Sequence, residues 1–197
     1  MSRPSVRVIK LGGSLLDWPE VTQSVRDWLA GQPPAANVVI VGGGPIVECL
    51  RELDRHHHFS PAAVHWLAVR GMSLTAAMLA EMWSEARVVT SIDELRLANS
   101  ENPQILDVER FLRGQLDSAD ALSCDWSVTS DSIAARVATF FKARELVLLK
   151  STLPAAGTCR ESWAESGFVD PYFPRASKDL AIRCVNLRAA GFPEIVG

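Results

Sequence analysis

A lysine, two glycines and a serine follow the first apolar segment of the chain, and this combination could bind phosphate. Residues 6–11 are predicted to form a strand that contains Lys10, and the strand runs into Gly12, Gly13 and Ser14. Glycines let backbone N–H groups approach an anion closely, and a lysine adds a mobile positive charge. It is not a Walker A loop, because the lysine precedes the glycines. Two interpretations stay open here: a loop that binds a di- or triphosphate, or a tight turn beside a solvated lysine.

Three consecutive glycines follow a second apolar segment at residues 37–41. Gly42, Gly43 and Gly44 precede Pro45, which suits the first position of a helix. Three adjacent glycines lose much backbone entropy on folding, so a turn without a function would rarely need all of them. A flexible turn is the alternative. Ligands of open α/β sheets bind at the carboxyl ends of the strands, so two glycine loops there predict two ligands or two ends of one reaction.

Hydroxyl groups and an aspartate crowd the start of a third predicted helix. Ser130 is a suitable N-cap, and Asp131 lies in the first turn, where the helix dipole favours a carboxylate. Capping explains one such residue but not the whole set, which is Ser127, Thr129, Ser130, Asp131 and Ser132. Another apolar segment, residues 145–150, ends in a lysine and is followed by two hydroxyl residues, Ser151 and Thr152.

Strand-like and helical segments alternate along the chain, which predicts an α/β fold. Further strands are expected at residues 87–90, 104–107 and 182–186, and further helices at 19–30, 61–85 and 108–116. Gly71 could split the longest of these helices. Strands that are apolar on both faces are typical of a parallel sheet covered by helices on each side. Residues 153–174 are rich in proline and glycine and are predicted to form a long loop, either functional or mobile.

Composition sets limits on the kind of protein. The chain has 197 residues, 48% hydrophobic and 22% charged, which predicts a single globular domain over residues 1–197. A net charge of -3 without a basic patch argues against nucleic-acid binding. No apolar run approaches the roughly 20 residues that span a bilayer, and no signal-peptide region is recognised after Met1–Pro4. With no C-x-x-C pair among the cysteines, we expect a cytoplasmic protein with reduced thiols and no membrane contact.

Three adjacent histidines, His56, His57 and His58, invite comparison with a metal site. Adjacent residues on a helix point about 100° apart, so their side chains cannot converge on one ion. We expect a solvated helix end, with its positive charge favoured by the helix dipole, and we predict no protein metal site.

Four stretches, in their order and spacing, resemble the motifs of the amino acid kinase family. They are residues 8–14, 39–45, 128–135 and 146–151. The family includes acetylglutamate, aspartate, uridylate, isopentenyl phosphate and carbamate kinases. Its fold is a three-layer α/β/α sandwich with a mainly parallel central sheet. The short length and the stretch at residues 129–135 are most similar to small archaeal-type kinases of methanofuran synthesis, which phosphorylate aminomethylfuran phosphate.

The resemblance implies roles for the residues that match. Lys10 would reach the transferred phosphoryl group, and Asp131 would orient Lys10. The nucleotide would be bound by Gly12, Gly13, Ser14, Lys150, Ser151 and Thr152, and the acceptor would be cradled by Gly42, Gly43 and Gly44. Phosphoryl transfer needs in-line positioning and cancellation of negative charge, which Lys10 and Mg²⁺ would supply.

The resemblance therefore implies an ATP-dependent, homo-oligomeric kinase that acts on a small-molecule phosphate or carboxylate, in methanofuran- or methanopterin-linked C1 cofactor synthesis. Two departures leave an alternative open. The family's Gly-Gly-Met segment with a second catalytic lysine is absent, so Lys150 could take the place of that lysine. The usual Asp-Gly after the nucleotide strand is replaced by residues 153–157. The alternative is a non-catalytic nucleotide- or oxyanion-binding protein on the same fold.

Overall fold

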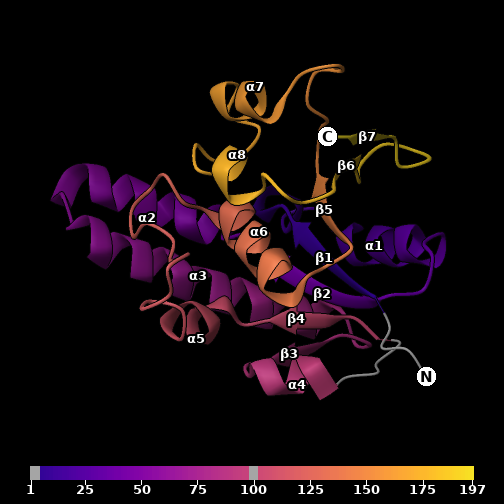
Figure 1. The fold of residues 1–197 in the computed structure, drawn as a ribbon, viewed down its shortest axis with the longest axis horizontal. Coiled ribbons are helices and arrows are strands. Elements are labelled where there is room, and N and C mark those ends of the chain that lie inside the picture. The colour runs from indigo at the N-terminus through magenta and orange to yellow at the C-terminus, as the bar shows by residue number, and fades with distance from the viewer. Residues whose placement is uncertain (1–4, 98–101) are drawn as a thin grey trace.

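A single seven-stranded sheet forms the centre of the molecule in the computed structural model, which describes residues 5–97 and 102–197 (Figure 1). The spatial order of the strands is β3-β4-β2-β1-β5-β6-β7. Their bounds are β1 Val6–Leu11, β2 Ala36–Val41, β3 Arg87–Val89, β4 Gln104–Leu106, β5 Glu145–Lys150, β6 Ile182–Asn186 and β7 Glu194–Val196. All neighbouring strands are parallel except β6 and β7. This confirms the predicted, mainly parallel sheet.

The register of the three central strands brings their carboxyl ends level. Leu11 at the end of β1 pairs with Val41 of β2 on one side and with Leu149 of β5 on the other. The loops that follow these strands therefore leave the sheet at the same edge. The glycines after β1, the glycines after β2 and the lysine that ends β5 are neighbours for this reason.

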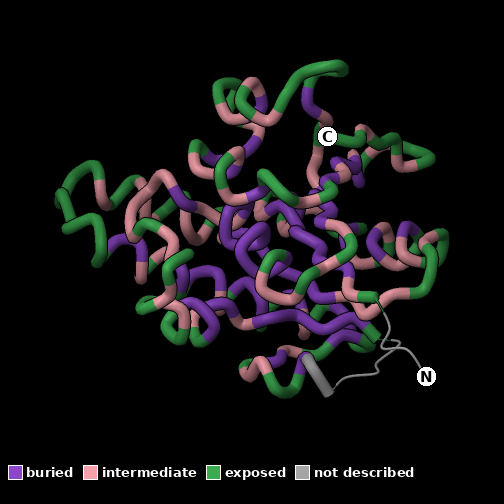
Figure 2. Tube along the Cα trace, viewed as in Figure 1, coloured by how far each residue is buried: buried purple, intermediate pink, exposed green. Residues whose placement is uncertain are grey.

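Helices cover both faces of the sheet, which gives the predicted three-layer α/β/α sandwich. Their bounds are α1 Val21–Ala30, α2 Gly44–His57, α3 Pro61–Met82, α4 Ile92–Leu97, α5 Val108–Arg113, α6 Ser130–Phe141, α7 Arg160–Glu165 and α8 Phe173–Ala176, with a short 3₁₀ turn at Gly13–Leu15. Residues of α5, α6, α7 and α8 join the core of one face, and residues of α1 join the core of the other. Figure 2 shows the buried segments gathered along the central strands and α6.

Central strands with apolar residues on both faces explain this layering. In β5, Val147 and Leu149 point into one core and Leu146 and Leu148 into the other, and all four side chains are fully buried. Burying each such side chain contributes about 1.5–3 kcal/mol, so a strand of this kind is stable only when helices cover both of its faces.

The longest helix, α3, is continuous through Gly71, so the predicted break does not occur. A Cβ atom at this glycine would lie 2.9 Å from a methyl group of Val47, so glycine lets α2 and α3 pack closely here. Among the described residues, α3 alone is long and apolar enough to cross a bilayer. Core helices meet the same criterion, and Val69 and Leu79 of α3 are buried in the two cores.

The C-terminal third differs most from expectation. The segment predicted as one long loop contains the short helices α7 and α8, and the antiparallel strand β7 follows β6. Proline and glycine obscured helices of only six and four residues, too short for a periodic pattern. The expectation about Met1–Pro4 lies outside the described residues. His56 and His57 form the exposed end of α2.

Candidate active site

A cavity of about 620 Å³ opens where the loops leave β1, β2 and β5. The predicted site residues that line it are Lys10, Gly13, Ser14, Gly42, Gly43, Gly44, Asp131 and Lys150. Gly12, Ser151 and Thr152 are adjacent to these residues in the chain but do not line the cavity. The structure therefore brings most of the predicted residues together.

The two glycine loops touch each other through their backbones. A Cβ atom on Gly13 would lie 2.2 Å from the nitrogen of Gly44, and one on Gly42 would lie 2.7 Å from the nitrogen of Gly13. Gly44 also has a positive φ of 53°, a conformation that favours glycine. Close backbone contact thus requires three of these glycines, independently of any ligand. The same contact also leaves backbone groups of both loops facing one cavity.

Asp131 forms ion pairs with two lysines at the floor of the cavity. The amino group of Lys10 lies 2.9 Å from Oδ1 of Asp131, and that of Lys150 lies 3.0 Å from Oδ2. All three side chains are largely buried, with exposed fractions of 6% for Lys10, 14% for Lys150 and 7% for Asp131. The lysines come from the ends of the adjacent strands β1 and β5, and the aspartate comes from the first turn of α6. The group therefore carries a net positive charge of one facing the cavity.

Burial and neighbouring charges shift the pKa values of Asp131 and Lys150. Burial alone would raise the pKa of Asp131, but the positive charges of Lys10 and Lys150 outweigh it and lower that pKa below its ordinary value. Burial, with the nearby charge of Lys10, lowers the pKa of Lys150, while Asp131 opposes this shift. The carboxylate is thus the group that holds two like charges at close range.

A second buried carboxylate, Asp170, binds the start of α6 from a distant loop. Its Oδ2 accepts hydrogen bonds from the backbone of Thr129 at 3.0 Å and of Ser132 at 2.9 Å, and both hydroxyl groups also donate to this carboxylate. Burial, with the charge of Asp131, raises the pKa of Asp170, and these hydrogen bonds oppose the shift. The prediction that Ser130 is the N-cap is wrong. Thr129 is the N-cap, and Asp170 supplies the capping oxygen by accepting from the backbone N–H of Ser132.

The loop before α8 also contacts Lys150 directly. The amino group of Lys150 donates a hydrogen bond to the backbone carbonyl of Phe168 and lies 4.4 Å from the centre of the Phe168 ring. Residues 167–171 line the cavity on this side. Asp170 and Phe168 thus tie one loop to both the start of α6 and the end of β5. A weak signal for this loop was present in the sequence, because a proline-rich stretch of that length is often functional.

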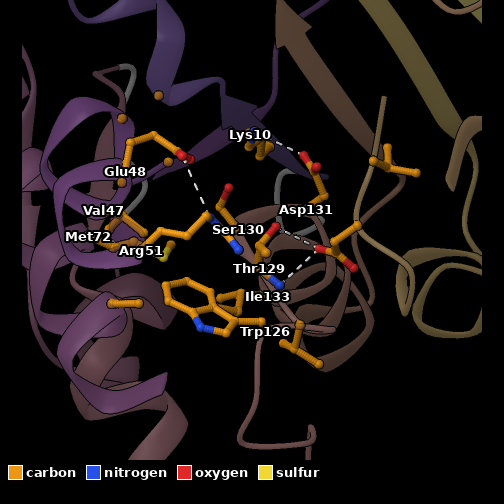
Figure 3. A pocket seen from close by; sticks show the side chains of 18 of the residues that line it. Lys10, Val47, Glu48, Arg51, Met72, Trp126, Thr129, Ser130, Asp131 and Ile133 are labelled. Carbon is orange, nitrogen blue, oxygen red and sulfur yellow. Dashed lines mark hydrogen bonds and ion pairs between the residues drawn. The ribbon is translucent and has the colours of Figure 1, made fainter. Parts of the chain in front are cut away.

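The far half of the cavity lies between α2, α3 and the segment before α6 (Figure 3). Glu48 and Arg51 of α2, His65 of α3 and Trp126 line this half, and sequence reasoning missed all four. Burial lowers the pKa of His65, although a hydrogen bond with the backbone of Asp125 and the charge of that residue oppose the shift. One signal was present in the sequence: Arg51 follows the triple glycine by two helical turns and so lies on the same face of the helix.

The charge distribution of this cavity suits phosphate rather than acid–base chemistry. Buried positive charges and backbone N–H groups stabilise an anion that forms during phosphoryl transfer. Among residues 5–97 and 102–197, no cluster of three or more His, Cys, Asp or Glu side chains could hold a metal ion. A magnesium ion that arrives with a nucleotide would therefore depend on phosphate oxygens and water for most of its ligands.

The chain is thus an α/β/α protein with a lysine–aspartate–lysine group at the carboxyl edge of its parallel strands. A sequence model of the amino acid kinase family matches residues 5–152. Because this match covers most of the chain, the chain belongs to the amino acid kinase family.

One curated relative is named [5-(aminomethyl)furan-3-yl]methyl phosphate kinase and comes from Methanocaldococcus jannaschii. It is 26% identical to this chain over 144 residues, which are 73% of the chain. The matched part spans 64% of the length of that relative.

Solved structures with the same fold include UMP kinase from Bacillus anthracis, with a TM-score of 0.66, 12% identity and full coverage of both chains. Uridylate kinase from Archaeoglobus fulgidus has a TM-score of 0.61 and 15% identity and covers 91% of this chain and 89% of its own. UMP kinase from Ureaplasma parvum has a TM-score of 0.61 and 13% identity, covering 96% and 93% respectively. At these identities the likeness concerns the fold alone.

Proposed function

We propose that the protein is an ATP-dependent kinase that transfers the γ-phosphoryl group to a phosphate or carboxylate of a small molecule. The observation that carries this proposal is the ion-paired group at the cavity floor, where Asp131 holds Lys10 and Lys150 beside two glycine loops. Membership of the family and a kinase as curated relative support the same conclusion.

In the proposed reaction an oxygen of the acceptor attacks the γ-phosphorus of ATP. A new P–O bond forms as the bond between the γ-phosphorus and the β–γ bridging oxygen breaks, and ADP leaves with that bond's electron pair. Lys10 neutralises charge on the moving group, and backbone N–H groups of both loops add fixed dipoles. Bound Mg²⁺ would neutralise charge on the nucleotide's phosphates. The chain needs no covalent intermediate.

Lys150 is proposed to take the role of the lysine that the missing Gly-Gly-Met segment would carry. It is buried beside Lys10 and shares the same carboxylate, so it brings a second positive charge to the cavity. We further propose that the nucleotide lies on the side of Gly13, Ser14 and Lys150, and the acceptor across Gly42–Gly44.

The acceptor proposed for the first test is the compound in the relative's name, [5-(aminomethyl)furan-3-yl]methyl phosphate. This would place the protein in C1 cofactor synthesis, in the cytoplasm, where ATP and Mg²⁺ are available. The predicted homo-oligomer stays a prediction; α3 carries the exposed apolar side chains of Leu67, Leu74 and Met78.

The test measures ADP release from Mg-ATP with a panel of phosphomonoesters and carboxylates. We expect turnover on a phosphomonoester that Lys10→Met reduces at least about 100-fold, as expected when a charge that stabilises the transition state is removed. Lys178→Met is the matched control, because Lys178 is an exposed lysine outside the cavity, and it should leave turnover unchanged.

One observation favours the alternative, a non-catalytic nucleotide- or oxyanion-binding protein. The amino group of Lys150 is already bonded to Asp131 and to the carbonyl of Phe168, which restrains its movement toward a phosphate. ATP binding by calorimetry, without Lys10-dependent ADP release on any acceptor of the panel, would support this alternative and refute the kinase.

A further inference from the structure

An arginine in the far half of the cavity has unused hydrogen-bond donors. Arg51 has a side chain 33% exposed, and its ion-pair partner is Glu48, with 3.6 Å between Nε and Oε2, which is longer than a hydrogen bond. The guanidinium group carries five N–H donors, and no side chain or carbonyl of the described residues accepts from it. Arg136 contrasts with it, because Arg136 donates to three neighbouring side chains.

The guanidinium group of Arg51 is nevertheless held in place. It lies 4.0 Å from the centre of the Trp126 ring, which is a stacking distance. The indole Nε1 of Trp126 donates to Asp54 at 2.8 Å, and the other oxygen of Asp54 accepts from the backbone of Phe59 at 2.9 Å. A positive group that is fixed before a ligand arrives loses little entropy on binding, so the site is pre-organised for an anion.

The position of Arg51 on α2 directs its side chain to the glycine loop. The residue lies two turns, or about 10 Å, beyond Gly44 along the helix axis. Helix side chains lean toward the N-terminus, so the guanidinium approaches the start of α2. Figure 3 shows Arg51 extending toward Ser130 at the start of α6. Arg51 therefore faces the cavity that the starts of α2 and α6 and the side chain of Lys10 also line.

We propose that Arg51 binds the phosphate group of the acceptor and thereby selects a phosphomonoester over a carboxylate. The phosphate lies between Arg51 and Lys10, and the organic group lies against the apolar wall formed by Val69, Met72 and Ile133. A phosphate offers three terminal oxygens to donors on both sides, whereas a carboxylate offers two and leaves donors unpaired. This inference rests on the proposed kinase activity and names its acceptor class.

Steady-state kinetics with [5-(aminomethyl)furan-3-yl]methyl phosphate and with benzyl phosphate test the assignment. We expect Arg51→Met to raise the KM for either acceptor by about 10- to 100-fold, the effect of losing charge-assisted hydrogen bonds, with the KM for Mg-ATP changed less than about twofold. Arg175→Met is the matched control, because Arg175 also stacks on an aromatic ring, that of Tyr172, but lies outside this cavity. Glu48→Gln should not raise the acceptor KM, because it keeps the guanidinium. An acceptor KM in Arg51→Met no higher than in Arg175→Met would overturn the assignment.

Binding without nucleotide separates this assignment from the kinase proposal. Calorimetry with benzyl phosphate and benzoate should show tighter binding of the phosphate ester, and about tenfold weaker binding of that ester to Arg51→Met. Trp126→Leu should also weaken it, because the guanidinium loses its stacking partner. Binding of benzyl phosphate through Arg51, without Lys10-dependent turnover of any acceptor in the panel, would refute the kinase and support the subsite. Turnover with equal acceptor KM values in wild type and Arg51→Met, or no binding of benzyl phosphate to the wild type, would refute the subsite.

Discussion

Replacing Asp131 by asparagine should destabilise the protein because it leaves two buried lysines facing each other without a counter-ion. In the wild type the carboxylate lies 2.9 Å from one amino group and 3.0 Å from the other, and all three side chains are at most 14% exposed. Breaking a buried ion pair by removing one partner costs about 3–5 kcal/mol. We therefore expect Asp131→Asn to lower the free energy of unfolding by about that amount, measured by urea denaturation at pH 7.

Repulsion between the two lysines contributes to the loss of stability in Asp131→Asn, so removing one lysine should offset part of that loss. In Asp131→Asn, Lys10 and Lys150 repel each other, so the additional change Lys150→Met should restore part of the lost stability. Residues in direct contact are expected to show coupling free energies of about 0.5–3 kcal/mol in such a double-mutant cycle. Asp120→Asn is the control, because Asp120 pairs with Arg136 at 3.3 Å but is 75% exposed, and its loss should cost less than about 1 kcal/mol.

The pH dependence gives a second readout of the same carboxylate. The pKa of Asp131 is lowered in the folded protein, so its contribution is present above the unfolded pKa and is lost as the pH falls through the folded pKa. The stability difference between wild type and Asp131→Asn should therefore grow as the pH rises from about 2 to 5. If Asp131→Asn costs no more than Asp120→Asn, or if Lys150→Met adds to the loss without compensation, the ion-paired group is not what holds the two lysines together.

Two further predictions follow from the same geometry. Asp170→Asn can keep one oxygen for the three donors at Oδ2, but it puts an amide N–H₂ where Oδ1 accepts from the Ser132 hydroxyl, so it should lower the free energy of unfolding by about 1–3 kcal/mol and reduce turnover. Burial raises the pKa of Asp170, so the contribution of this group to stability falls as the pH rises from the unfolded pKa toward the folded pKa. The difference in unfolding free energy between the wild type and Asp170→Asn should therefore shrink over this pH range. A difference that widens would contradict a raised pKa for Asp170. Gly44→Ala should lower thermal stability and turnover, because its Cβ would lie 2.6 Å from the oxygen of Gly13. Gly157→Ala, at a similar positive φ but with open space around it, should cost only the backbone strain of about 1–2 kcal/mol, and equal losses in the two variants would show that the loop contact is unimportant.

Much of the fold could be predicted because its signals are local. Strands β1, β2 and β5 are largely apolar, although β1 contains Arg7 and Lys10; glycines follow β1 and β2, and β5 ends in a lysine. Alternation of these strands with helices indicates a parallel sheet, and the carboxyl ends of its strands meet at one edge. The convergence of Lys10 with the triple glycine was predictable on this ground. The short helices α7 and α8 were not, because six and four residues give no periodic pattern.

The candidate site was only partly predictable. Resemblance to a family indicated Lys10 and Asp131, but nothing local shows that Lys150 would share the same carboxylate. Asp170 and Arg51 went unrecognised because their partners are distant in the chain: Asp170 binds a helix that begins some 40 residues earlier, and Arg51 stacks on Trp126, 75 residues later. Contacts of this kind depend on how the helices pack around the sheet.

Strand and turn preferences act over a few neighbouring residues, so the order of residues alone specifies a parallel α/β sheet with two glycine loops and a lysine at one edge. What those residues face depends on the three-dimensional structure. It showed that Gly13 and Gly44 are required by contact with each other, and that one carboxylate holds two buried lysines. These outcomes follow from long-range packing, in which buried charges must find counter-ions among residues that lie far apart along the chain.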